Sequence, residues 1–126
     1  MATELTSNTS TLGHFGFVTW LVDFDSTTDV TDSIVIDLSA QNYTNSIKVL
    51  EVEIVATNGL GVRLEFDEGG GDTLVAFHPA GAAGVVRQTY YDLPSGGLVG
   101  TGDIVATTTA GANTYGANVN IKYWVD

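Results

Sequence analysis

Strict alternation of apolar and polar residues in several short segments is the feature that most constrains the fold of this chain. In "ANVNIKYWVD", the last ten residues, the apolar side chains on one face are Val119, Ile121, Tyr123 and Val125. Successive side chains of a β-strand point to opposite faces, so this period predicts a strand with one buried face. The same alternation recurs in "FVTWLVDF", "SIVIDLS", "KVLEVEIVA" and "GVRLEF".

Two of these segments predict particular core residues. In "FVTWLVDF", Trp20 shares a face with Val18 and Val22, so we expect it in the core. In "KVLEVEIVA", the alternation places Leu50 and Val52 inward.

Three further segments complete the expected set of strands: 73–78, 85–93 and 103–109. Glycine-rich stretches such as "DEGGGD" and "HPAGAAG" separate them, and glycine favours turns because it adopts positive φ angles. No ten-residue stretch has the apolar spacing of a helix. The sequence therefore predicts an all-β protein, a single antiparallel β-sandwich of about eight strands with jelly-roll character.

The N-terminal segment has a different composition. Residues 1–12 are rich in Ser and Thr, with Leu5 and Leu12 as the large aliphatic side chains. We therefore expect a flexible, extended N-terminal arm over 1–12 and the sandwich domain over 13–126. The arm is either a solvated tail or a segment that docks on a partner.

Charge and composition restrict the partners. The chain has 4 Lys and Arg against 15 Asp and Glu, and no Cys. Nucleic acids and anionic membranes are disfavoured, because both are bound largely through cationic side chains. The N-terminus lacks the basic and apolar regions of a signal peptide, so we expect synthesis in the cytoplasm. The low charged fraction fits equally a surface covered by partners and a Thr-rich β-domain.

The segment "VDFDSTTDVTD" is the first candidate metal site, because four aspartates lie within it: Asp23, Asp25, Asp29 and Asp32. An EF-hand loop would need a ligand and a glycine where Thr27 and Thr28 stand, and a glutamate where Ile34 stands. Asp and Ser favour turns, since their side chains bond to nearby backbone amides. We therefore expect a solvated connection between strands, and no metal or cofactor.

Catalytic residue sets are not evident. His14 and His78 have no nucleophile or orienting partner nearby in the sequence. Glu51 and Glu53 share one face of one strand, whereas a glycosidase needs carboxyl groups facing each other across a cleft. The sequence predicts a protein that is not an enzyme.

Aromatic residues supply the candidate contact surface. Trp124 falls on the polar face of the last strand, beside Asn118, Asn120 and Lys122. An aromatic side chain on a polar face indicates contact with another sheet or another chain. Tyr90 and Tyr91 are adjacent and must point to opposite faces, so at most one joins this surface. The candidate contact residues are Leu5, Leu12, Trp124 and Tyr90.

The segment "YYDLPSGGLVGTGDIVATTTAGANTYGANVNIKYWVD" resembles the C-terminal part of small β-sandwich virion proteins of tailed bacteriophages, many of which are capsid decoration (cement) proteins. The resemblance implies a non-enzymatic protein on the capsid exterior that binds the major capsid protein at subunit junctions and stabilises the mature head. It further implies self-association, with a homotrimer expected, but transfers no functional residue. Two alternatives remain: a carbohydrate-binding jelly roll with a groove lined by Trp124 and a tyrosine, or a neck, tail or head-fibre component.

Overall fold

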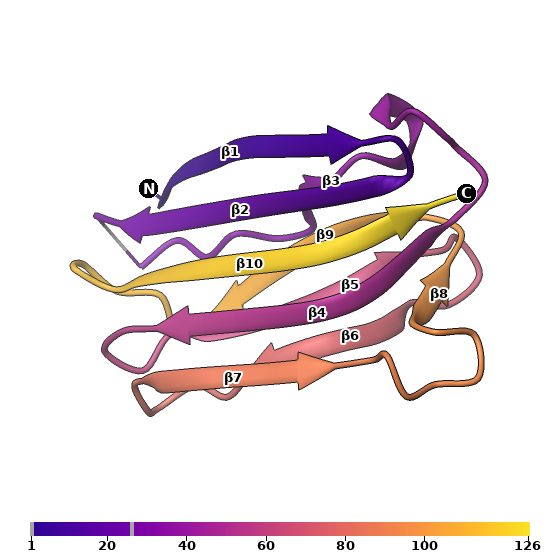
Figure 1. Ribbon diagram of the computed structural model, residues 1–126. Helices are drawn as coiled ribbons and strands as arrows, with labels where there is room; N and C mark the ends of the chain where they lie inside the picture. The colour runs from indigo at the N-terminus through magenta and orange to yellow at the C-terminus, as the bar shows by residue number, and fades with distance from the viewer. Residues whose placement is uncertain (1, 26) are drawn as a thin grey trace.

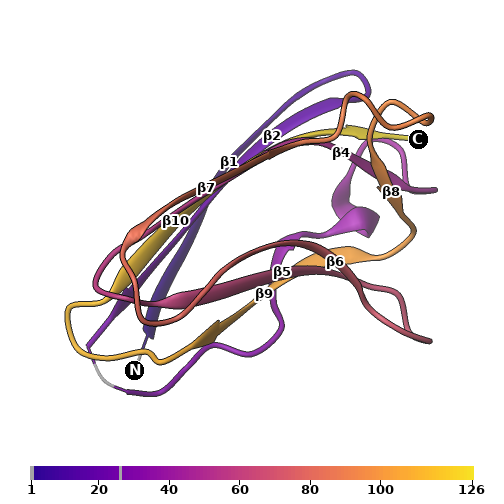
Figure 2. The same ribbon diagram turned by 90° about the horizontal axis from the view of Figure 1, so that it is seen from below.

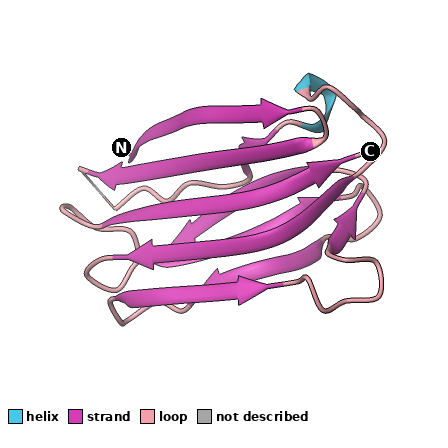
Figure 3. Cartoon of the chain, in the orientation of Figure 1, coloured by secondary structure: helices cyan, strands magenta, loops and turns pink. Residues whose placement is uncertain are grey.

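The computed structural model describes the backbone of residues 2–25 and 27–126, and the side chains of residues 13–25 and 27–126. These residues form ten strands and one short 3-10 helix (Figure 3). The elements are β1 (Ala2–Leu12), β2 (Phe15–Phe24), β3 (Ser33–Ile36), η1 (Leu38–Ala40), β4 (Ile47–Ala56), β5 (Gly61–Asp67), β6 (Thr73–His78), β7 (Gly84–Thr89), β8 (Leu98–Gly100), β9 (Asp103–Thr109) and β10 (Gly116–Val125).

The strands form two sheets that pack face to face, as the turned view shows most clearly (Figures 1 and 2). Sheet A has the order β1-β2-β10-β4-β7, with β8 also paired to β4, and sheet B has the order β3-β9-β5-β6. All of these pairings are antiparallel. With β1 and β8 set aside, the eight remaining strands have the order of a jelly roll, β2-β10-β4-β7 facing β3-β9-β5-β6, and successive strands change sheet except at the β5–β6 hairpin. The predicted fold class is confirmed.

The core lies between the two sheets and consists of the inward side chains of alternating strand residues. Trp20 and Tyr123 are its largest fully buried side chains, which confirms their predicted inward orientation. Gly16 lies against the ring of Tyr123, and a Cβ atom there would come within 2.2 Å of Tyr123 Cζ. A residue with any side chain at this position would therefore displace the tyrosine from the core.

Residues 1–12, for which we expect a flexible arm, instead contain the edge strand β1, paired along β2. Leu5 lies opposite Leu21 in the register and Leu12 lies opposite Phe15. An edge strand is held by backbone hydrogen bonds to one neighbour, so it forms without the apolar alternation on which our expectation depended. Met1 and the side chains of Leu5 and Leu12 lie outside the described residues.

A β-bulge in β4 shifts the predicted alternation by one residue. Lys122 pairs with Glu51 whereas Tyr123 pairs with Val49, which leaves Leu50 as the additional residue. Val49 and Val52 consequently both face the core, and Leu50 is buried outside it. The same shift places Lys48 and Glu51 together on the outer face of sheet A.

Candidate functional site

The outer face of sheet A, here called the A face, carries Trp124 together with the polar residues that accompany it on β10 and the glutamates Glu51 and Glu53 of β4. It consists of the outward residues of β2, β10, β4 and β7: Phe15, Phe17, Thr19, Leu21, Asp23, Asn118, Asn120, Lys122, Trp124, Lys48, Glu51, Glu53, Val55, Val85, Arg87 and Thr89. Phe15 pairs with Trp124, and Trp124 pairs with Lys48 on its other side. The A face therefore has an aromatic end and a polar middle.

The aromatic end contains four rings from three separate segments. His14 stacks between Tyr43, at a centroid distance of 3.8 Å, and Trp124, at 4.6 Å. Phe15 meets Trp124 in a T-shaped contact at 6.0 Å. His14 Nδ1 donates to the carbonyl oxygen of Val125 at 2.6 Å, which fixes the imidazole between its neighbours. Phe15 is 43% exposed and Tyr43 is 42% exposed, so the cluster is open to a partner.

Of these four rings, only Trp124 was predicted from the sequence to be a contact residue. Phe15 follows from the alternation of β2, whose outward residues begin with it. Tyr43 lies in the connection between η1 and β4, where no periodicity indicates an orientation. Its stacking on His14 depends on how that connection crosses the end of sheet A.

Tyr90, the other aromatic candidate, lies away from the A face. Its ring packs against the core and its hydroxyl donates to the carbonyl oxygen of Val75 on the edge strand β6. Burial raises the pKa of the Tyr90 phenol above its ordinary value. Tyr91 is 51% exposed and donates to Glu51 Oε2 at 3.2 Å. The structure therefore does not bring Trp124 and Tyr90 together in one groove.

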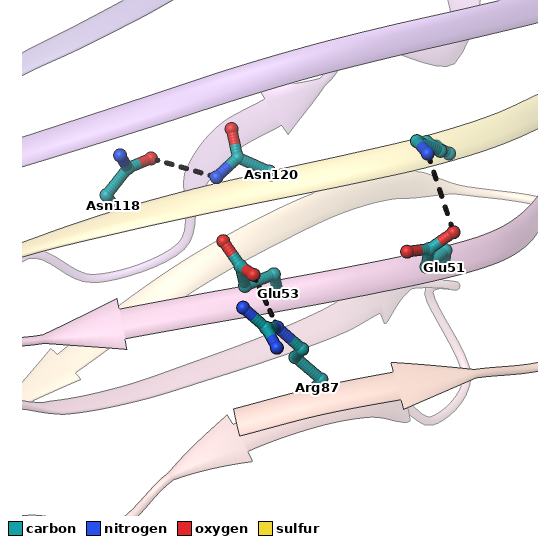
Figure 4. A network of polar contacts seen from close by, with 6 residues as sticks. Glu51, Glu53, Arg87, Asn118 and Asn120 are labelled. Carbon is teal, nitrogen blue, oxygen red and sulfur yellow. Dashed lines mark hydrogen bonds and ion pairs between the residues drawn. The ribbon is translucent and has the colours of Figure 1, made fainter. Parts of the chain in front are cut away.

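The polar middle is a network of hydrogen bonds and ion pairs (Figure 4). Arg87 Nε donates to Glu53 Oε2 at 2.6 Å, and Lys122 Nζ lies 3.6 Å from Glu51 Oε2. Asn120 accepts from Thr19 Oγ1 at 2.8 Å and donates to Asn118 Oδ1 at 3.3 Å. These contacts cross three strand boundaries, β2–β10, β10–β4 and β4–β7.

The charges of the outward strand residues of the A face balance, and the carboxylate of Asp126, which accepts from Trp124 Nε1 at 3.1 Å, adds one negative charge beside the aromatic end. The cations among the strand residues are Lys48, Arg87 and Lys122, and the carboxylates are Asp23, Glu51 and Glu53. Three of the four basic residues of the chain therefore lie on this face, and the entire formal net charge of −11 belongs to the rest of the chain. A negatively charged partner therefore meets less repulsion from the strand residues of the A face than from the acidic remainder of the chain.

The acidic segment after β2 is held by hydrogen bonds to β9 and to the loop that follows it. Asp29 Oδ1 accepts from Thr108 Oγ1 at 2.9 Å and from the backbone N–H of Gly111 at 2.9 Å. The backbone N–H of Asp32 donates to Thr107 Oγ1 at 3.0 Å. Among the described residues, no group of three or more potential ligands is placed to hold a metal ion. That the protein needs no metal remains a prediction.

The two histidines both bond to backbone. His78 is buried at the end of β6 and its Nδ1 donates to the carbonyl oxygen of Leu60 at 3.1 Å. His14 belongs to the aromatic end. Glu51 and Glu53 lie side by side on the A face, paired with basic side chains. These positions give each residue a structural partner, and the absence of enzymatic activity stays a prediction.

Comparison with known proteins gives little further guidance. No protein-family model matches the sequence, and no curated protein matches it. Among solved structures, the chain is similar to one from the virus-like particle of extra small virus of the giant freshwater prawn Macrobrachium rosenbergii. The identity is 13%, the match covers 99% of this chain and 80% of that chain, and the TM-score is 0.31. At this TM-score the jelly-roll assignment rests on the strand order of the chain itself. The described residues include no helix with the length and apolar character that a membrane span requires.

Proposed function

We propose that this protein is a structural component of a virion, a decoration protein that binds the outer surface of a capsid and stabilises the mature shell. In this role it contacts the major capsid protein at subunit junctions, associates with itself as a homotrimer and catalyses no reaction. The observation that carries the proposal is the exposed aromatic end of the A face, built from His14, Phe15, Tyr43 and Trp124.

The aromatic end has the properties of a protein-contact surface. Aromatic side chains dominate interface energetics, and truncation of one at the centre of an interface typically costs about 2 kcal/mol or more. The rings are already ordered by stacking, so little conformational entropy is lost when a partner covers them. They lie at the end of a face whose outward strand residues have balanced charges, beside the carboxylate of Asp126.

The fold and the C-terminal resemblance support the same role. Jelly rolls recur in viral capsid and lectin domains, which is an analogy at the level of the fold. A decoration protein acts by mass action, because a ligand that binds only the assembled shell stabilises that shell. Many copies on one particle add avidity without any new kind of contact.

The test is co-sedimentation of the purified protein with capsids that lack decoration. We expect saturable attachment and increased resistance of the shell to heat. Trp124→Ala should weaken attachment by more than about tenfold, because it removes the central ring of the aromatic end. Phe77→Ala is the matched control, since Phe77 is an exposed aromatic residue on the other sheet. Protein that stays in the supernatant at saturating concentration would contradict the role.

Two alternatives to a capsid decoration protein remain to be distinguished. The carbohydrate-binding alternative was a groove lined by Trp124 and a tyrosine; Tyr90 is not that tyrosine, because its ring packs against the core away from the A face. A neck, tail or head-fibre component would use the same contact residues on a different partner. Gold-labelled antibody against the protein, viewed on intact virions by electron microscopy, distinguishes the capsid from the tail.

A further inference from the structure

A hollow in the polar middle of the A face adjoins the aromatic end, because its residues Phe17 and Lys122 pair next to Phe15 and Trp124. It has a volume of about 260 Å³ and is lined by Phe17, Glu51, Glu53, Asn120 and Lys122. Asn120 and its neighbour Thr19 are short, whereas the surrounding side chains are long, so the surface dips between β2, β10 and β4. Phe17 is 37% exposed and forms the apolar side of the hollow.

Each glutamate of the hollow uses one carboxylate oxygen in hydrogen bonds or ion pairs and leaves the other available as an acceptor. Glu53 uses Oε2 to bind Arg87, and Glu51 uses Oε2 to bind Tyr91 and Lys122. Within the described part of the chain, the other oxygen of each carboxylate has no partner. Figure 4 shows the second oxygen of Glu53 in the space between β10 and β4, on the side of Asn120, and the second oxygen of Glu51 beside the β4 ribbon. The ion pairs thus hold two acceptors ready for a ligand.

The combination of groups selects a class of ligand. The hollow offers carboxylate acceptors, an ammonium donor and an amide that both donates and accepts. With Arg87 included, the two cations around the hollow balance its two carboxylates. The glutamates therefore repel an anionic ligand, and the basic side chains repel a metal ion. A sugar hydroxyl both donates and accepts, and the C–H face of a sugar ring packs on an aromatic side chain such as Phe17.

We propose that this hollow is a binding site for one ring of a neutral glycan. Its volume lies just below the range of about 300–1,000 Å³ typical of small-molecule sites, which suits a single ring rather than a long chain. The site is open, so a single sugar should bind with a Kd of about 1 mM, corresponding to about −4 kcal/mol. Display of many copies on one particle would raise the apparent affinity for a glycan-coated surface.

The test has two parts, an array of neutral and acidic oligosaccharides and an NMR titration with the methyl glycosides of glucose, galactose, mannose and N-acetylglucosamine. We expect signal from neutral glycans and none from sialylated or sulfated ones. Amide shifts should change along β2, β10 and β4. No binding of any neutral glycan in either experiment, or a preference for acidic glycans, would overturn the proposal.

Variants locate the site and separate it from the capsid role. Phe17→Ala, Glu53→Gln and Asn120→Ala should each weaken glycan binding by about tenfold or more, because each removes a ligand contact. Glu65→Gln is the matched control, since Glu65 pairs with Arg63 at 3.1 Å on the outer face of sheet B. Unchanged binding by all three variants would overturn the assignment. Capsid co-sedimentation is scored separately, so the two proposals can fail independently.

Discussion

At the scale of single residues, Asp29 is the carboxylate on which the acidic segment most depends. One of its oxygens accepts from both Thr108 Oγ1 and the backbone N–H of Gly111. We predict that Asp29→Ala lowers the free energy of unfolding by about 1–3 kcal/mol, the cost of leaving such donors unpaired. Asp72→Ala, at an exposed position in the β5–β6 turn, should change it by less than about 0.5 kcal/mol.

Urea denaturation of the two variants measures this difference. Equal stability of Asp29→Ala and Asp72→Ala would show that the hydrogen bonds of Asp29 do not hold the loop. We expect no calcium site in this segment, so calcium should leave the melting temperature of the wild-type protein unchanged. A rise would contradict this, because a ligand that binds only the folded state increases its stability.

Glu68 gives a residue-scale prediction of pH dependence. Its carboxylate accepts from Thr73 Oγ1 at 2.7 Å and from the backbone N–H of Thr101 at 3.0 Å. The Thr73 hydrogen bond, followed by that from the Thr101 backbone, lowers the pKa of Glu68 below its ordinary value. A lowered carboxyl pKa stabilises the folded state above the unfolded-state pKa, about 4.3 for Glu, and this stabilisation is lost as the pH falls through the folded-state pKa.

We therefore expect Glu68→Gln to be less stable than wild type near neutral pH, and the difference to shrink as the pH falls to about 3. Urea denaturation across this range measures it. In an NMR titration, Thr73→Val should move the Glu68 pKa back toward its ordinary value. A stability difference independent of pH would contradict the assignment.

At the scale of elements, β1 is separable from the rest of the fold. The eight strands of the jelly roll are complete without it, and it pairs only with β2. We predict that deletion of residues 1–12 leaves a cooperatively folded β-sandwich of lower stability. Because the deletion exposes the edge of β2, the shortened protein should self-associate more readily. Capsid attachment should also weaken.

Circular dichroism during thermal melting and light scattering after size-exclusion chromatography check this prediction. Loss of cooperative unfolding would mean that β1 is required for the core. If the shortened protein attaches to capsids as well as wild type does, residues 1–12 are not part of the contact surface.

The elements also show what the sequence can and cannot predict. Alternation identifies a strand wherever one face is buried and the other wet, which is why β2, β4, β5 and β10 were predicted. Edge strand β1 and the three-residue strand β8 carry no such pattern. The bulge at Leu50 is invisible because every residue from Val49 to Val52 except Glu51 is apolar.

The candidate site was predictable to the same limited extent. The outward position of Trp124 followed from the alternation of β10. The stacking of Tyr43 and His14 on its ring did not, because it depends on a tertiary arrangement of loops. The inward position of Tyr90 likewise depends on its contact with β6, which is distant in the sequence.

At the scale of the whole molecule, the separation of charge decides which surface can dock. The outward strand residues of the A face have balanced charges, whereas the rest of the chain carries the full net charge of −11. Copies crowded on a shell repel one another through their acidic surfaces, and salt screens this repulsion over about 10 Å at 0.1 M ionic strength. Contacts made by the aromatic end are not weakened by screening.

We therefore predict that capsid attachment stays constant or becomes tighter as salt is raised from about 0.05 to 0.5 M. Co-sedimentation at several salt concentrations measures the affinity. The control is the double variant Glu51→Gln and Glu53→Gln, which gives the A face two uncompensated cations and should make attachment depend on salt. If wild-type affinity instead falls by more than about tenfold, ion pairs dominate the interface. In that case an acidic surface, rather than the A face, binds a basic region of the capsid.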